Sequence, residues 1–277
     1  MTAPAVRPSP RSPWARPSVV PSPLVFAHRG GAALGPENTF AAFDRAVALG
    51  VDGLELDVRL SRDGEVVVHH DRTLRRTAGR PDAVARLTAG ELATVDVGRH
   101  FPGVSSGPPA TGVPRLRDVL ARYPSLLLIV ELKVNDARLA RAVVEDVAAA
   151  DAVDRVCVGG FQGGVLRAVR ATDPRVATSA GREEVRWLLY RSWIGWTPRR
   201  AAYCALQVPE MAGRTRVVSP RFLALAHRAG LTVHVWTVDR PDDVTRLAAM
   251  GVDGIITDRP DVALSVLGRS RVPGEGA

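Results

Sequence analysis

The chain has 277 residues, of which 46% are hydrophobic and 24% are charged, and its formal net charge is +8. This length and composition fit one large α/β domain or two small ones with an ample core. The sequence has no apolar run approaching 18 residues, no basic run interleaved with aromatic residues and no unbroken apolar segment near its start. These features argue against a membrane-spanning helix, a nucleic-acid partner and a secretory signal, so we expect a cytoplasmic protein.

Both ends of the chain are predicted as tails. Residues 1–23 contain a proline every few positions and three arginines without an acid, which predicts a disordered segment. Residues 269–277 are expected to form a flexible C-terminal tail. The two tails carry four of the eight net positive charges, so the body at 24–268 is only mildly basic.

In chain order, the body begins with a predicted strand at 24–27 and a helix that starts after the polar segment 36–39 and ends at a glycine. A second strand follows at 53–60, and a turn at 61–65 leads to another extended segment at 66–71. The turn is too short for a parallel crossover, so these two segments should form an antiparallel hairpin.

This hairpin gathers ionisable side chains in one place. Glu55 and Asp57 are two residues apart, so both point to the same face of their strand. Folding back about the turn brings His70 level with the two carboxylates. The adjacent His69 should face the other way and serve as a packing residue.

The segment after the hairpin, residues 72–114, is predicted to be an insertion or a small subdomain. A helix at 115–122 then leads to a continuous apolar strand at 126–133, which is typical of a strand covered on both faces. The carboxyl end of that strand carries Glu131 and Lys133 on one face. Lys133 is the only lysine of the sequence, which hints that a compact ammonium group is needed there.

The rest of the body alternates between helices and strands. Helices are predicted at 136–149, 162–171, 183–193, 219–229 and 241–249, and strands at 155–158, 176–179, 205–208, 232–238 and 254–257. Segment 50–57 recurs as 251–258 with Ile256 in place of Glu55, which favours a functional role for Glu55. This pattern favours an α/β fold, a (β/α)8 TIM-type barrel with a small insertion after the third strand. An open doubly wound sheet is the alternative, but no glycine-rich phosphate fingerprint follows the first strand.

In such a barrel the carboxyl ends of the strands meet at one face. The charged and aromatic residues predicted at or near these ends are His28, Arg29, Glu55, Asp57, His70, Glu131, Lys133 and Trp236. Three converging carboxylates need a counter-charge, and oxygen ligands without cysteine suit calcium or magnesium. Two histidines can exchange protons near neutral pH, while the arginine and lysine suit an anion, most naturally a phosphoryl group.

Other residues of the same types have simpler interpretations. His227-Arg228 falls in the last turn of a helix, where it complements the helix dipole. His100 lies in a loop, and His234 is expected to be lining or structural. Cys157 and Cys204 stand in apolar strand-like runs and are predicted as buried reduced thiols.

The motifs occur in a characteristic order. They are His28-Arg29, residues 36–39, Glu55-x-Asp57, His70-Asp71, Glu131-Leu132-Lys133, residues 236–238 and residues 254–258. This series resembles the glycerophosphodiester phosphodiesterase family of the phospholipase C-like phosphodiesterase superfamily, over residues 24–265. Two positions depart from the family pattern: Asp239 stands where Asn is usual, and Gly160-Phe161 where Ser-Phe is usual.

The resemblance implies hydrolysis of glycerophosphodiesters to sn-glycerol 3-phosphate and an alcohol, by way of a cyclic phosphate. It also implies one divalent cation, Ca²⁺ or Mg²⁺. The implied roles are metal binding by Glu55, Asp57 and Glu131, acid–base catalysis by His28 and His70, and phosphate binding by Arg29 and Lys133. We also predict that Trp236 and Phe161 line the substrate.

The alternative functions are a phospholipase C- or lysophospholipase D-like phosphodiesterase acting on lipids and a catalytically silent binding module on the same barrel. Insensitivity to chelators would indicate a metal-independent enzyme of the first kind. Segment 182–200 holds three tryptophans and five arginines, and is interpreted either as an outer helix packed beneath the following loop or as a weak membrane-surface contact. The alcohol, the choice of cation and the oligomeric state stay open.

Overall fold

The structure is a computed structural model that describes Trp14 and residues 22–103, 111–198 and 200–269. Of the predicted tails, Trp14, residues 22–23 and Arg269 are therefore described, and the rest lies outside the described residues. Within the described part, no helix is long and apolar enough to cross a membrane.

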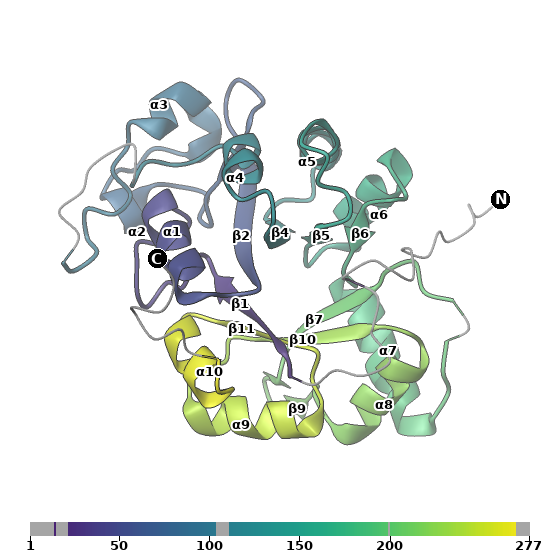
Figure 1. Cartoon of the computed structure of the whole chain (residues 1–277). Coiled ribbons are helices and arrows are strands. Elements are labelled where there is room, and N and C mark those ends of the chain that lie inside the picture. Colours follow the sequence, from purple (N-terminus) through teal and green to yellow (C-terminus); the bar gives the residue numbers. More distant parts are fainter. Residues whose placement is uncertain (1–13, 15–21, 104–110, 199, 270–277) are drawn as a thin grey trace.

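Eight parallel strands of the described chain form a nearly closed barrel (Figure 1). They are β1 (Leu24–His28), β2 (Gly53–Leu60), β4 (Leu127–Leu132), β5 (Val156–Gly159), β6 (Ala177–Thr178), β7 (Ala205–Pro209), β10 (Thr232–Trp236) and β11 (Gly254–Thr257). Their spatial order is β6-β5-β4-β2-β1-β11-β10-β7, and a parallel bridge between Ser179 and Ala205 joins the two ends of this order. The predicted TIM-type barrel is confirmed.

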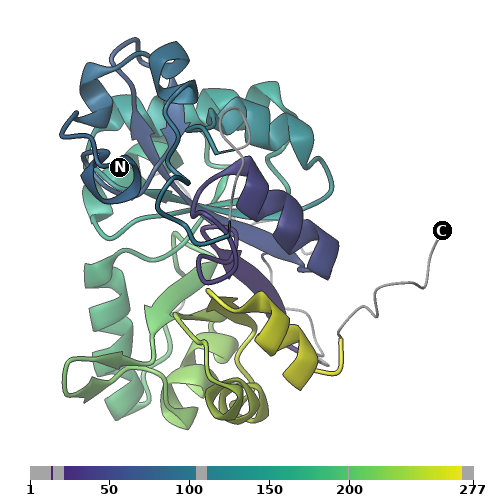
Figure 2. The same cartoon turned by 90° about the vertical axis from the view of Figure 1, so that its left-hand side faces the viewer.

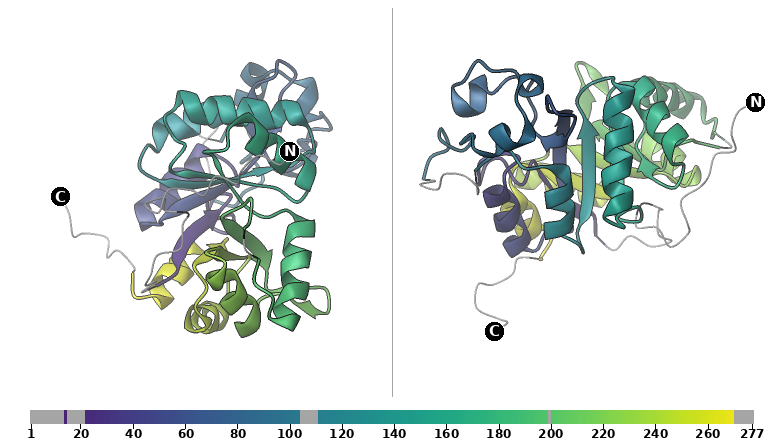
Figure 3. Two further views of the ribbon diagram at one scale, coloured as in Figure 1. Left: turned by 90° about the vertical axis from the view of Figure 1, so that its right-hand side faces the viewer. Right: turned by 90° about the horizontal axis from the view of Figure 1, so that it is seen from above.

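Helices surround the barrel and bury their apolar sides against the strands (Figures 1 and 3). They are α1 (Phe40–Leu49), α4 (Leu116–Arg122), α5 (Ala137–Ala149), α6 (Gly163–Thr172), α7 (Arg182–Ile194), α8 (Pro220–Arg228), α9 (Pro241–Met250) and α10 (Pro260–Val266). Helix α10 was not predicted from the sequence, although a proline at its first position is a recognised start signal. A small hairpin of β8 (Met211–Ala212) and β9 (Thr215–Arg216) was not predicted either, because strands of two residues carry no periodic pattern.

The predicted hairpin is present. β3 (Val66–Val68) pairs antiparallel with β2, with Val58 opposite Val68, and lies outside the barrel. The insertion that follows contains α2 (Arg75–Ala78), a 3-10 turn at Val84–Arg86 and α3 (Ala89–Ala93). It has its own buried cluster, and it projects from one side of the barrel in Figures 2 and 3.

The repeated segments have matching structural roles. Asp52, just before β2, accepts a hydrogen bond of 2.7 Å from the backbone of Val25 in the neighbouring β1. Asp253, just before β11, accepts one of 2.8 Å from the backbone of Val233 in the neighbouring β10. Asp253 also lies 2.9 Å from Nε2 of His227, in the last turn of α8. Each copy thus ties a strand to its neighbour at the amino end.

The glycines that open these two strands make room for rings inside the barrel. A Cβ at Gly53 would lie 2.7 Å from the ring of Phe26, and one at Gly254 would lie 2.7 Å from the ring of His234. The rings of Phe26, His234 and Trp14 pack together with centroids 5.3–6.1 Å apart, and all three residues are buried. His234 is therefore a core residue at the amino ends of the strands.

Candidate active site

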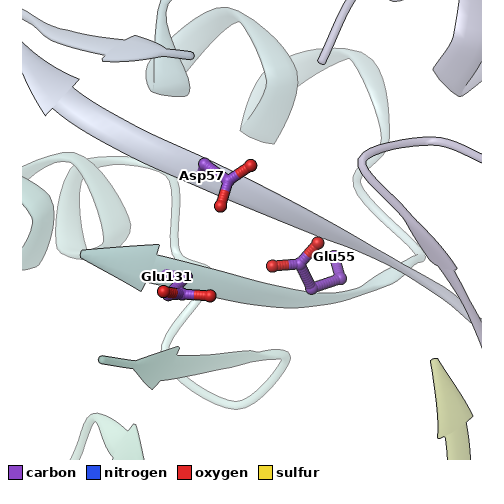
Figure 4. A group of neighbouring side chains, drawn as sticks. All are labelled: Glu55, Asp57 and Glu131. Carbon is purple, nitrogen blue, oxygen red and sulfur yellow. The ribbon is translucent and has the colours of Figure 1, made fainter. Parts of the chain in front are cut away.

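Three carboxylates meet at the carboxyl ends of β2 and β4. Glu55 and Asp57 point to one face of β2, and Glu131 stands opposite Asp57 on the neighbouring β4. One oxygen of each lies within 4.8 Å of those of the other two (Figure 4). Glu55 and Asp57 are buried, and Glu131 is partly exposed. This oxygen-only donor set fits a hard divalent cation.

The acids differ in how well their charges are compensated. Burial raises the pKa of Glu55 to about 8, and repulsion by Asp57 adds to this effect. Burial also raises the pKa of Glu131, against the attraction of Lys133. Burial would raise the pKa of Asp57 too, but Lys133 and Arg29 hold it below its ordinary value. Two of the three carboxyl groups thus lack enough positive charge, as expected for residues that bind a cation.

Two basic side chains border the acids. Arg29 follows β1, and its Nε lies 3.2 Å from Oδ2 of Asp57. Lys133 follows β4, and its Nζ lies 3.2 Å from Oδ1 of Asp57 and 2.9 Å from Oε1 of Glu131. Both cations therefore lie beside the predicted metal ligands.

His28, at the end of β1, is held between two carboxylates. Its Nδ1 lies 2.7 Å from Oδ1 of Asp258, just after β11, and its Nε2 lies 3.8 Å from Oε2 of Glu55. Burial would lower the pKa of His28, but the charge of Glu55 and the hydrogen bond with Asp258 together raise it to about 9. The Nδ1 contact fixes the ring and turns Nε2 toward the acids.

The paired histidines separate as predicted. His70 is partly exposed, and its Nδ1 lies 2.7 Å from Oδ1 of Asp71. His69 is buried on the opposite side, with Nε2 3.4 Å from the carbonyl oxygen of Thr73, and burial lowers its pKa. The backbone N–H of His69 donates to the carbonyl of Asp57 at 2.8 Å. The prediction that His70 is level with the two carboxylates is therefore wrong by one position: the residue level with Asp57 is His69, and His70 lies one position beyond.

Aromatic side chains border the same end of the barrel. Phe161 follows β5 and makes an edge contact with Trp236 at the end of β10, with centroids 5.9 Å apart. Nζ of Lys133 lies 5.8 Å from the centroid of Phe161. The two predicted lining residues are therefore brought together beside the predicted phosphate-binding lysine.

A set of supporting residues was not predicted from the sequence. Asn38 donates a hydrogen bond of 2.8 Å to Oδ2 of Asp57, and Glu37 accepts one of 3.1 Å from Arg29. Both stand in the polar segment 36–39, after which the sequence predicts a helix. Thr39 is the actual cap of α1, because its hydroxyl accepts from the backbone N–H of Ala42, so the two residues before it are free to reach the site.

A second missed residue links the insertion to the site. Arg76, in α2, lies 2.6 Å from Oε2 of Glu37 and 2.7 Å from Oδ2 of Asp71. Asp71 in turn contacts His70, so one arginine of the insertion supports the carboxylate partners of both Arg29 and His70. Asp71 and Asp258 belong to the sequence motifs, but their hydrogen bonds to His70 and His28 depend on the fold and could not be predicted from the sequence.

Asp239, one of the two departures from the family pattern, has a structural role. Its Oδ1 accepts hydrogen bonds from the hydroxyl of Thr257 at 2.9 Å and from the backbone N–H of Asp258 at 2.8 Å. Asp239 therefore helps to fix the end of β11, from which Asp258 reaches His28. At Gly160, an added Cβ would make ordinary contacts with its neighbours.

The family model described as "Glycerophosphoryl diester phosphodiesterase family" matches residues 28–262. The chain belongs to this family. This match confirms the predicted family and, with the named relatives below, the predicted class of enzyme.

Curated relatives match most of the chain. "Probable glycerophosphodiester phosphodiesterase 2" of Mycobacterium tuberculosis is 34% identical over 251 residues, which cover 88% of this chain and 90% of that protein. "Glycerophosphodiester phosphodiesterase" of Caldanaerobacter subterraneus is 32% identical over 263 residues, which cover 88% of this chain and 97% of that protein. "Lysophospholipase D GDPD1" of Rattus norvegicus is 24% identical and covers 85% and 83%.

Solved structures of similar proteins share the fold. A putative glycerophosphoryl diester phosphodiesterase of Silicibacter pomeroyi matches with a TM-score of 0.74 and 28% identity, covering 91% of this chain and 96% of that one. A phosphodiesterase of Oleispira antarctica, solved with the product sn-glycerol-3-phosphate, matches with a TM-score of 0.71 and 23% identity, covering 89% and 97%.

Proposed function

We propose that this chain hydrolyses glycerophosphodiesters to sn-glycerol 3-phosphate and an alcohol, using one divalent cation. The observation that carries the proposal is the convergence of Glu55, Asp57 and Glu131 between two histidines, each with a carboxylate on its Nδ1. Relatives named for this reaction and the Oleispira antarctica complex with its product support the choice of substrate.

Glu55, Asp57 and Glu131 would hold the cation. Calcium and magnesium both suit oxygen ligands, and both stay candidates. When bound, the cation would supply positive charge to a phosphoryl oxygen and to the developing transition state. Arg29 and Lys133, each beside Asp57, would bind the remaining phosphate oxygens.

His28 and His70 would exchange the protons of the reaction. In each, Nδ1 contacts a carboxylate, which orients the ring and leaves Nε2 for the substrate. One histidine takes the proton of the glycerol hydroxyl as its oxygen bonds to phosphorus, and the other protonates the departing alcohol oxygen. A water molecule then opens the cyclic phosphate with the same two proton transfers in the reverse direction, giving sn-glycerol 3-phosphate.

We also propose a cytoplasmic location and no nucleic-acid partner. Cys157 and Cys204 are buried free thiols within the barrel, which is compatible with a reducing compartment.

The test is the release of sn-glycerol 3-phosphate from several glycerophosphodiesters, with metal-free protein, with added Ca²⁺ or Mg²⁺, and with excess EDTA. We expect turnover with metal and none with EDTA. Full turnover in EDTA by protein free of metal would instead identify a metal-independent phospholipase C-like enzyme. No turnover of any diester under any condition would favour a binding module.

A second candidate is a lysophospholipase D-like reaction, which the name of the Rattus norvegicus relative supports, together with binding to a membrane surface. The side chains of Trp187, Trp193, Ile194 and Trp196 are 58–74% exposed, and Tyr190 contacts both Trp187 and Trp193. These aromatic residues are therefore not packed beneath the following loop. The start of α7 contacts the site mouth through Arg182 and Phe161. The exposed aromatic residues lie further along α7 and just past its C-terminus, away from the site mouth.

Exposed aromatic and basic residues on one helix suit the interface of an anionic bilayer. The test compares vesicle binding of the wild type with that of Trp193→Ser/Trp196→Ser, and measures release of lysophosphatidic acid from lysophospholipids. Vesicle binding that the double variant loses, together with lysophospholipid turnover, supports this candidate. No vesicle binding at low salt and no lysophospholipid turnover overturns it.

A further inference from the structure

Arg182 extends the aromatic rim of the site with a positive charge. Its guanidinium carbon lies 5.5 Å from the centroid of Phe161, the ring that also contacts Trp236 and lies 5.8 Å from Nζ of Lys133. The backbone N–H of Arg182 donates to the carbonyl of Phe161 at 3.0 Å. Two independent contacts thus hold the start of α7 against the loop after β5.

The charge of Arg182 is available to a ligand. Among the residues that the structure describes, no carboxylate forms an ion pair with it, and its side chain is exposed. Glu184, in the same turn, binds the backbone N–H of Gly181 and the guanidinium of Arg170 instead. Arg29, at the same end of the barrel, is by contrast paired with Glu37 and Asp57.

The position of Arg182 also opposes the usual electrostatics of a helix. It is the first residue of α7, where the helix dipole favours an acid and disfavours a cation. Packing against Phe161 and the carbonyl contact account for where the residue lies, but they do not require a positive charge there.

We propose that Arg182 selects the alcohol of the substrate: a neutral or anionic alcohol is preferred over a quaternary ammonium alcohol such as choline. An aromatic pair open to solvent would attract a quaternary ammonium group. Here Phe161 is already bordered by the cations of Lys133 and Arg182, so a choline group would meet like charge at the rim. The glycerol half of the substrate is uncharged, so the alcohol is the part whose charge this rim can distinguish.

This inference rests on the proposed function and deepens it. The experiment measures kcat/KM, in low and in high salt, for glycerophosphocholine, glycerophosphoglycerol and bis(glycerophospho)glycerol, whose leaving alcohols are cationic, neutral and anionic. The wild type should prefer the neutral and anionic alcohols over choline by about three- to tenfold at low salt, the effect of one unit charge about 6 Å away when the surroundings are close to bulk water. The preference should shrink at high salt because salt screens exposed charges.

In Arg182→Gln the preference should fall toward one, and in Arg182→Glu it should reverse. Arg141→Gln removes an exposed arginine from α5 and should leave the preference unchanged. Thermal melting of each variant checks that the fold is kept.

The outcomes separate the two proposals. If the wild type releases sn-glycerol 3-phosphate from none of the diesters, the proposed function fails. If it does so without a charge preference, or if Arg182→Gln and Arg182→Glu change all three rates equally, the role of Arg182 is overturned while the proposed function stands.

Discussion

Asp258 connects the last strand of the barrel to the catalytic residue predicted on the first: its Oδ1 lies 2.7 Å from Nδ1 of His28. The parallel pairing of β1 with β11 brings the two together across 230 residues of sequence. The other nitrogen of His28, Nε2, lies 3.8 Å from Oε2 of Glu55. The contact of Nδ1 with Asp258 therefore fixes Nε2 as the nitrogen that faces the acid cluster.

The first prediction concerns this contact. In Asp258→Asn the ring of His28 loses its charged partner, so kcat should fall by about 10²-fold or more, while KM should change little. Steady-state kinetics on glycerophosphoglycerol measures both constants. Asp261→Asn is the matched control, because Asp261 pairs with Arg259 outside the site. If kcat and KM change no more than they do in the control, Asp258 has a structural role only.

The second prediction separates metal binding from stability. Glu55 is buried and its pKa is raised to about 8, so in the absence of a cation the folded protein must hold this carboxyl protonated at neutral pH, which costs stability. Glu55→Gln should therefore lose Ca²⁺ or Mg²⁺ binding and activity together, yet melt no lower than the wild type when both are in EDTA. Calorimetric titration and thermal melting measure these effects, with the exposed Glu145→Gln as control. Undiminished metal affinity in Glu55→Gln would remove this residue from the ligand set.

The third prediction uses the neighbouring histidines as controls for each other. His70→Ala should lower kcat by about 10²–10⁴-fold, the usual contribution of acid–base catalysis, with little loss of stability. His69→Ala should keep its activity but lower the free energy of unfolding by about 1–3 kcal/mol, because His69 is buried beneath the insertion. Activity assays and denaturant unfolding decide this, and the opposite pattern would reverse the two assignments.

The fourth prediction concerns the only lysine of the chain. The ammonium of Lys133 lies within 3.2 Å of two carboxylates and 5.8 Å from the ring of Phe161. A planar guanidinium is larger and carries its donors in a fixed fork, so Lys133→Arg should lose most of the activity although the charge is kept. Initial rates at saturating substrate test this. A rate close to that of the wild type would mean that only the charge matters.

The barrel and the acid cluster were predictable because they follow from local pattern and strand direction. Glu55 and Asp57 share a face because strands alternate, and Glu131 joins them because parallel neighbours end at one side. Asp258 and Arg76 were not predicted as partners of site residues, because the first depends on strand order and the second on how the insertion folds back.

The position of Trp14 was not predictable for a similar reason. A proline-rich composition indicates disorder, but it does not say whether one large aromatic residue finds a complementary cavity. In the structure, Trp14 stacks on Phe26 at 6.0 Å and lies 6.1 Å from His234. The room for these rings comes from Gly53 and Gly254, in two distant copies of one repeated segment.

The last prediction follows from the burial of His234. Burial lowers the pKa of this residue from an ordinary value of 6.5 to about 4, with weak opposition from Asp253. The unfolded chain therefore binds more protons than the folded chain between these pH values, and the stability present above pH 6.5 is lost as the pH falls toward 4. At pH 4.5 this one group should cost about 2–3 kcal/mol of unfolding free energy relative to pH 7.

His234→Gln removes the titration, so its unfolding free energy from urea titrations should fall less steeply over this range. His100→Gln changes an exposed histidine and should keep the wild-type slope. Equal slopes in all three proteins would show that His234 is open to protonation in the folded state.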